Sequence, residues 1–240
     1  MTNNALSCLD ITEFCQHPRY RLSGLTRVNL IVGPNGVGKS ELLRRIGCAH
    51  HDPPTCQHTD VSPQHSDIVL MRWKDLLRAE PTHYSAALNL CRIVEPNLLD
   101  ILVTKDNETN HQLSCVLPHA IVRIDRMSGA LQRLLWLSIN LELCGSWIVT
   151  IDNIDRDLHW TAMAEMWRYV VRRSIERDLQ VFCTTHSHDC MVGLARICRD
   201  ENPNQYLEAI SLHRIGADFD HSVDYDGVWS LSTVWRTKSK

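Results

Sequence analysis

Hydrophobic and polar positions along the chain follow strand-like and helix-like patterns in turn, which is typical of an α/β protein. Short apolar or β-branched runs predict strands at residues 7–14, 28–32, 147–151 and 180–184, with two weaker runs around Ile210 and Val228. The pattern predicts helices at residues 129–144 and 160–176, and another helix that ends near Arg199. Because helices and strands alternate after Gly129, we expect a mainly parallel sheet covered by helices.

The middle of the chain is less regular. Residues 50–65 are rich in Pro, His, Asp, Thr and Gln without either period, which predicts a surface loop. The next segments are an apolar run interpreted as a strand, a helix and an alternating stretch, at residues 68–73, 84–93 and 111–124. We therefore expect a single domain over residues 1–240 with a small inserted α/β lobe at about residues 50–125.

Composition places the chain among ordinary packed proteins. Of its 240 residues, 44% are hydrophobic and 22% are charged, which excludes disordered and fibrous classes. The chain shows neither a secretory signal nor an apolar run long enough to cross a membrane, so we expect a cytoplasmic protein. A net charge of −3 gives no global support for nucleic-acid binding, although a local contact stays possible.

The segment GPNGVGKS fits the Walker A pattern G-x-x-x-x-G-K-[ST] without a mismatch, between a predicted strand and a predicted helix. Glycines let successive N–H groups point at phosphate oxygens. Lys39 would add a cation at the β- and γ-phosphates, and the Ser40 hydroxyl would bind Mg²⁺. The motif therefore predicts ATP and Mg²⁺ binding. The candidate residues of this loop are Gly33, Asn35, Gly36, Val37, Gly38, Lys39, Ser40 and Glu41.

Two further polar side chains follow predicted strands. Asp152 ends an apolar strand, and we expect it to hold Mg²⁺, directly or through water, opposite Ser40. His186 lies just after the strand at residues 180–184, at the sheet edge where α/β proteins bind ligands. It is a candidate to contact the γ-phosphate or the attacking water. The alternatives are a turn-capping Asp152 and a structural His186.

With these three sites in order, and MSGALQRLLWL before the Asp152 strand, the chain resembles AAA-type P-loop ATPases of the OLD-like group. These proteins have ABC-type ATPase heads. The matching segments are LTRVNLIVGPNGVGKSELLRRI, MSGALQRLLWL, IVTIDNIDRDLHW and LQVFCTTHSHD. The resemblance implies a head-to-tail dimer in which Ser128 and Gly129, the signature residues, meet the γ-phosphate of ATP held by the other subunit. Taken alone, MSGAL predicts the N-capped start of a helix.

Asn153 departs from the family, which usually has a glutamate directly after the Asp152 position. An amide can orient the attacking water but cannot act as a general base, and losing that base typically costs ~10²–10⁴-fold in rate. Lys39, Asn153 and His186 are therefore the candidate catalytic residues of an ATPase whose turnover is slow or impaired. Ala130 is a smaller departure, because the family commonly has a second glycine there.

The resemblance implies that ATP-driven dimerisation controls a partner, in defence or in a DNA-associated process. The expected dimer is a homodimer or a pair with a paralogous head, and the effector would be encoded separately, as would any nuclease. Asn153 motivates an alternative, a non-hydrolysing ATP-dependent switch or scaffold. A third possibility is the ATPase subunit of a transporter, which MSGAL disfavours because transporters carry LSGGQ.

Overall fold

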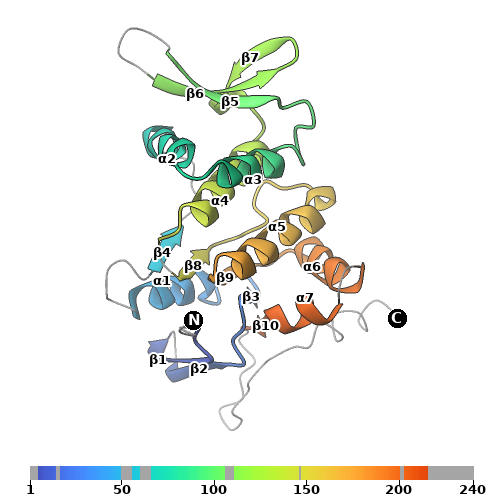
Figure 1. The fold of residues 1–240 in the computed structure, drawn as a ribbon. Coiled ribbons are helices and arrows are strands. Elements are labelled where there is room, and N and C mark those ends of the chain that lie inside the picture. The colour runs from blue at the N-terminus through green and yellow to red at the C-terminus, as the bar shows by residue number, and fades with distance from the viewer. Residues whose placement is uncertain are drawn as a thin grey trace. The chain divides into compact units, whose positions relative to one another are not determined.

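The structure, a computed structural model, describes residues 5–14, 17–49, 56–59, 66–105, 111–145, 147–200 and 203–215 (Figure 1). The chain divides into two compact units. The first unit holds residues 1–60, 145–155 and 170–240, and the second holds residues 61–144 and 156–169. Helix α5 (Met163–Glu176) contributes residues to both. The single domain with an inserted lobe at about residues 50–125 stays a prediction.

A five-stranded sheet forms the centre of the first unit. Its strands lie in the order β10-β3-β9-β8-β4, and every neighbouring pair is parallel. All positions of β3, β8 and β9 are buried, as expected for parallel strands with both faces covered. The predicted parallel sheet of an α/β fold is therefore confirmed. The strands are β3 (Val28–Val32), β4 (Cys56–Thr59), β8 (Ile148–Ile151), β9 (Gln180–Thr185) and β10 (Ile210–Arg214).

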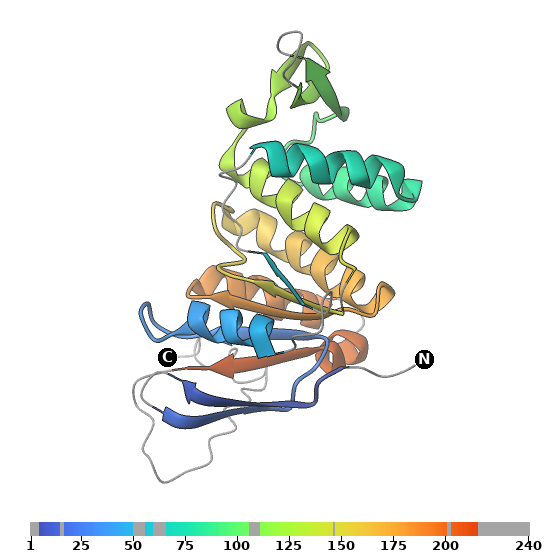
Figure 2. The same cartoon turned by 90° about the vertical axis from the view of Figure 1, so that its left-hand side faces the viewer.

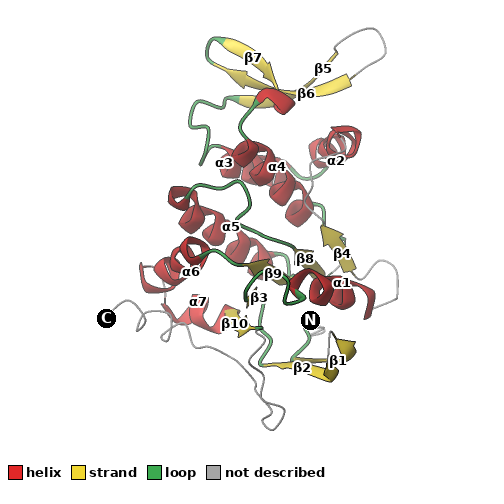
Figure 3. Cartoon of the chain, turned by 180° about the vertical axis from the view of Figure 1, so that it is seen from behind, coloured by secondary structure: helices red, strands yellow, loops and turns green. Residues whose placement is uncertain are grey.

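Helix α1 (Lys39–Ala49) packs on this sheet against β4, β8 and β9 (Figure 2). Its residues Leu42, Leu43 and Ile46 are fully buried and share a core cluster with Ile31 of β3 and Phe182 of β9. The same cluster takes in a separate antiparallel hairpin of β1 (Cys8–Phe14) and β2 (His17–Ser23) (Figure 3). Helices α6 (His188–Asp200) and α7 (Pro203–Ala209) follow β9.

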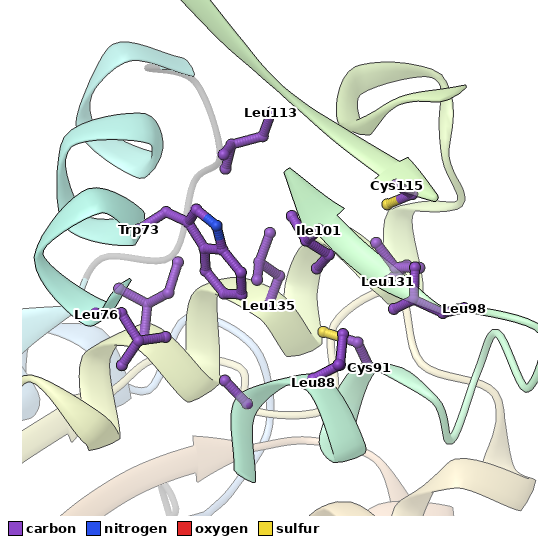
Figure 4. Close-up of a cluster of buried hydrophobic side chains, with 12 residues drawn as sticks. Trp73, Leu76, Leu88, Cys91, Leu98, Ile101, Leu113, Cys115, Leu131 and Leu135 are labelled. Atoms are coloured by element: carbon purple, nitrogen blue, oxygen red, sulfur yellow. The ribbon is translucent and has the colours of Figure 1, made fainter. Parts of the chain in front are cut away.

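The second unit combines helices with an antiparallel sheet. Its core cluster gathers Trp73 of α2, Ile101 of β5 and Leu135 of α4 (Figure 4). The strands pair in the order β5-β6-β7. Its elements are α2 (Ser66–Arg78), α3 (Pro81–Cys91), β5 (Asp100–Lys105), β6 (His111–Leu117), β7 (Ala120–Arg123), the short helix η1 (Ile124–Arg126), α4 (Gly129–Glu142) and the short helix η2 (Trp160–Ala162).

Two of the predicted elements are wrong. The run at residues 68–73 lies within α2 and is not a strand, because Trp73 and Leu76 are buried whereas Met71 and Leu77 are exposed, which is helical spacing. A short apolar run does not by itself distinguish a buried strand from a helix. Within the predicted loop at residues 50–65, residues 56–59 form β4, which pairs with β8. Backbone pairing needs no apolar sequence, so CQHT gave no strand signal.

Residues 50–55 and 60–65 of that predicted loop, and the predicted strand around Val228, lie outside the described residues. The predicted helices at 129–144 and 160–176 are confirmed as α4 and as η2 with α5. In the part of the chain that the structure describes, no helix is long and apolar enough to span a membrane.

Candidate nucleotide-binding site

The P-loop of residues 33–40 leaves the carboxyl end of β3 and enters α1. Gly36 and Gly38 have φ angles of 81° and 95°, a backbone region that side chains with a Cβ rarely adopt. Gly33 is required for another reason. A Cβ there would lie 2.2 Å from the carbonyl oxygen of Ile215, which follows the neighbouring strand β10. The amide of Ile215 is itself bonded to the Val32 carbonyl at 2.8 Å, so the backbone at this point has little freedom to move.

Lys39 lies folded back over the start of the loop. Its ammonium donates to the carbonyl oxygens of Gly33 at 2.8 Å and Pro34 at 2.7 Å, and the residue is 7% exposed. Burial lowers the pKa of this ammonium from its ordinary 10.5, and the Asp152 carboxylate partly opposes that effect. The carbonyl bonds hold the cation beside the loop, where a phosphate oxygen could replace either carbonyl as its partner.

The two predicted metal ligands, Ser40 and Asp152, meet directly. The Ser40 hydroxyl donates to Oδ2 of Asp152 at 2.7 Å, and the Thr184 hydroxyl donates to Oδ1 of the same carboxylate. Asp152 follows β8 and Thr184 lies in β9, the adjacent parallel strand. Parallel strands bring their carboxyl ends to one sheet edge, which explains why residues distant in sequence converge. A hydroxyl and a carboxylate are the oxygen donors that Mg²⁺ prefers, so this donor set fits the predicted metal.

Asn153 has a left-handed backbone, with a φ of 46°. Asn adopts this region more readily than most residues, because its short polar side chain tolerates it. Its amide donates to the Thr184 hydroxyl at 2.8 Å, so Thr184 binds both Asp152 and the residue after it. The backbone at this position therefore favours Asn over the longer glutamate of the resembling family.

The turn that carries His186 is held by a second threonine. The Thr185 hydroxyl donates to Oδ1 of Asp155 at 2.6 Å and accepts from the Ser187 amide at 3.0 Å. His186 itself is exposed. Successive side chains of a strand point in opposite directions, and Thr184 and Thr185 accordingly bond two different aspartates. No pattern in the sequence predicted these bonds of the two threonines.

The Glu41 carboxylate is engaged by its own helix. It forms ion pairs with Arg44 and Arg45, both at 2.7 Å. The hydrogen bonds from these arginines lower the pKa of Glu41 from its ordinary 4.5 to about 2. Any contribution of Glu41 to nucleotide binding would therefore come from its backbone N–H at the start of α1, where an N-terminus attracts phosphate.

The signature residues of the second unit start helix α4. Ser128 is the N-cap residue, and its hydroxyl accepts from the Leu131 amide at 3.3 Å. The predicted N-capped helix start is thus confirmed. Both Ser128 and Gly129 are exposed. A Cβ on Gly129 would lie 3.4 Å from Cβ of Asp157, so the start of α4 lies against the loop that contains Asp157.

Comparisons with known proteins complete this description. No known protein family and no curated protein matches the chain. Among solved structures, it is similar to the SMC head domain from Thermotoga maritima, with 14% identity, a TM-score of 0.49, and coverage of 78% of this chain and 91% of that one. It is also similar to an SMC head bound to the C-winged helix domain of ScpA, with 12% identity, a TM-score of 0.53 and the same coverage. The second likeness shows the fold alone, which is that of an SMC head domain.

Proposed function

We propose that this chain is an ATP- and Mg²⁺-binding P-loop ATPase head that acts as a dimer of heads. The observation that carries the proposal is the contact between the Ser40 hydroxyl and the Asp152 carboxylate at 2.7 Å, next to the Lys39 ammonium. The Walker A loop supplies the Ser40 hydroxyl and the Lys39 ammonium, and the Asp152 carboxylate follows a separate strand, β8. Their convergence, in a fold like that of an SMC head, is what a triphosphate with a bound divalent cation requires.

The proposed roles follow from the positions of the groups. The backbone amides of the P-loop surround the phosphates, and Lys39 exchanges its carbonyl partners for β- and γ-phosphate oxygens. Ser40 and Asp152 hold Mg²⁺, which when bound would neutralise charge on the phosphates. Thr184 keeps the Asp152 carboxylate oriented toward Ser40. His186 contacts the γ-phosphate, and Asn153 orients the attacking water without accepting its proton.

The proposed dimer has a copy of this chain, or a paralogous head, as the partner. Ser128 and Gly129 then bind the γ-phosphate held by the other head, because both are exposed at the start of α4, where the helix offers N–H groups and a positive dipole end. The related SMC head is bound to a separate protein, ScpA. We propose that this chain likewise binds an effector protein that is encoded separately. The proposed family is the OLD-like group, and the proposed location is the cytoplasm.

Equilibrium binding of a fluorescent ATP analogue, with and without Mg²⁺, tests the nucleotide site. We expect Lys39→Ala to abolish binding and Asp152→Asn to remove its dependence on Mg²⁺. Lys105→Ala is the matched control, because Lys105 is an exposed lysine of the second unit. Wild-type protein that does not bind, or Lys39→Ala protein that binds as well as wild type, would contradict the proposal.

A second candidate function, the non-hydrolysing switch, is favoured by the amide and the left-handed backbone of Asn153. Steady-state phosphate release separates the two. Turnover that Lys39→Ala abolishes supports the ATPase, whereas tight binding without turnover supports the switch. Asn153→Asp and Asn153→Glu should both raise turnover, and Asp is the better fit because it tolerates a positive φ. If neither variant gains while folding and ATP binding stay intact, the role assigned to residue 153 is wrong.

A further inference from the structure

We propose that Trp160 anchors the contact between two copies of this chain in the ATP-bound dimer, beside Ser128 and Gly129. This inference rests on the proposed function, because it needs the head-to-tail dimer proposed above. It adds a residue that lies outside the Walker A loop and the signature residues and follows Asp152 by eight positions. The occupant of this surface is therefore a second copy of the chain.

Trp160 is the most exposed of the tryptophans that the structure describes. Its indole is 59% exposed, whereas the other tryptophans that the structure describes, at positions 73, 136, 147 and 167, are buried or half-buried. Tryptophan is enriched in protein interfaces, where it dominates the binding free energy. A large aromatic surface left in water on one copy is available for burial against another.

Trp160 lies close in sequence to Asp157, the residue that lies against Gly129 of the signature. Asp157 lies against Gly129, and Trp160 follows three residues later, which limits its Cα to about 10 Å from that of Asp157. Both residues lie in the second unit together with Ser128. All of them, and the intervening His159, are exposed. Trp160 therefore lies within the span of an ordinary protein interface centred on Ser128 and Gly129.

The Trp160 ring already has an aromatic neighbour on its own chain. It begins the short helix η2, and the ring of His159 lies 5.5 Å from the Trp160 ring. His159 is fixed in turn by a hydrogen bond between its Nδ1 and the Thr161 hydroxyl at 3.0 Å. A side chain ordered beforehand loses little conformational entropy on binding. Arg156 pairs with Asp157 at 3.9 Å and so places a cation beside this carboxylate.

The test is sedimentation velocity of the full chain with Mg²⁺ and a non-hydrolysable ATP analogue. We expect Trp160→Ala to raise the dimer dissociation constant by about 30-fold, the effect of losing an interface hot spot. Trp160→Phe should restore most of the affinity, and Trp160→Gln should not. Ile121→Ala is the matched control, because Ile121 is 63% exposed in β7 of the same unit and lies outside the proposed contact. Circular dichroism and ATP affinity below the dimerisation concentration should not change.

The outcomes distinguish this inference from the function on which it rests. Wild-type protein that binds ATP but stays monomeric overturns the proposed dimer, and the role of Trp160 with it. A dimer that Trp160→Ala does not weaken overturns the role of Trp160 alone. Equal weakening by Trp160→Ala and Ile121→Ala also overturns it, because the effect would then not be specific to the surface beside the signature.

Discussion

The two units hold their candidate residues in different ways. In the first unit, Ser40, Asp152 and Thr184 come from the P-loop helix and two adjacent strands, and their side chains bond to one another. In the second unit, Ser128 caps its own helix, and Gly129 contributes only close backbone approach to Asp157. The first arrangement brings distant segments together at the candidate site, whereas the second exposes one helix start.

The two sets of contacts differ in how strongly they indicate a binding role. Hydrogen bonds between side chains of separate elements form only in the folded protein. Neither helix nor strand stability requires Ser40 and Asp152 to meet at the sheet edge. An N-cap serine stabilises its helix whether or not a ligand binds. The function of Ser128 must therefore be tested by variants that separate its capping role from its binding role.

The largest effect is expected from Gly33→Ala in the first unit. The new Cβ would lie 2.2 Å from the Ile215 carbonyl oxygen, and the strands β3 and β10 would have to separate there. We expect a loss of about 3 kcal/mol in the free energy of unfolding, together with loss of ATP binding. Urea denaturation measures it. Gly145→Ala is the control, because no atom lies within 4 Å of its Cβ, and it should be nearly neutral.

Glu142→Gln tests a buried polar cluster of the second unit. The Glu142 carboxylate, 1% exposed, accepts from the Tyr169 hydroxyl at 2.5 Å and bonds Nδ1 of His83 at 2.6 Å. When Nδ1 of His83 carries its proton, the carboxylate accepts from both partners, and Gln keeps only one of these two acceptor oxygens, at a cost of about 2 kcal/mol. Urea denaturation should show this loss while ATP binding persists. Glu80→Gln, at the exposed start of α3, should cost little, and equal losses in both variants would contradict the prediction.

Thr184→Val and Thr185→Val test whether the two threonines have separate roles. Each variant removes a buried hydroxyl bonded to an aspartate and should cost about 1.5 kcal/mol. Only Thr184→Val should weaken Mg²⁺-dependent ATP binding, because only Asp152 contacts Ser40. Thr185→Val releases the turn before His186, so we expect slower phosphate release with normal ATP affinity. Identical binding and turnover profiles for the two variants would show that the threonines are not separate in function.

Ser128→Asp separates capping from phosphate binding in the second unit. Asp is as good an N-cap as Ser, so the stability of the fold should not change, whereas Ser128→Ala should cost about 1 kcal/mol. Asp also places a negative charge where the γ-phosphate would bind. The Asp variant should therefore lose ATP-dependent dimerisation, measured by sedimentation. The Ala variant should lose it as well, because it lacks the hydroxyl that would bind the phosphate. An Asp variant that dimerises like wild type would leave Ser128 with its capping role alone.

The smallest effect is expected at Glu41, whose pKa the arginines lower from 4.5 to about 2. A lowered carboxyl pKa contributes stability above the unfolded value, and that contribution is lost as the pH falls from 4.5 through 2. Because the ion pair is exposed, Glu41→Gln should cost only about 0.5 kcal/mol at neutral pH, and most of this cost should be gone at about pH 2. Urea midpoints at both pH values measure the difference, with Glu208→Gln of α7 as the control.

The local motifs were predictable, because their chemistry depends on neighbours in sequence. The P-loop glycines and the strand before Asp152 are local, and the parallel sheet followed from alternating helices and strands. Strand β4 and helix α2 were not predictable, because CQHT has no apolar pattern and the run at residues 68–73 suits two periods. The hairpin partner β2 was missed for a similar reason, since HPRYRLS is mostly polar.

What the sequence alone determined is the candidate phosphate loop and the candidate oxygen donors, because glycine spacing and residue type are read directly from the sequence. What only the tertiary structure decided is which donors meet. Strand β9 lies between β3 and β8, so Thr184 reaches Asp152 and holds it toward Ser40. Strand order depends on packing across the whole sheet, which no local pattern encodes. The same holds for Gly129 and Asp157, which are distant in sequence and lie against each other only in the folded unit.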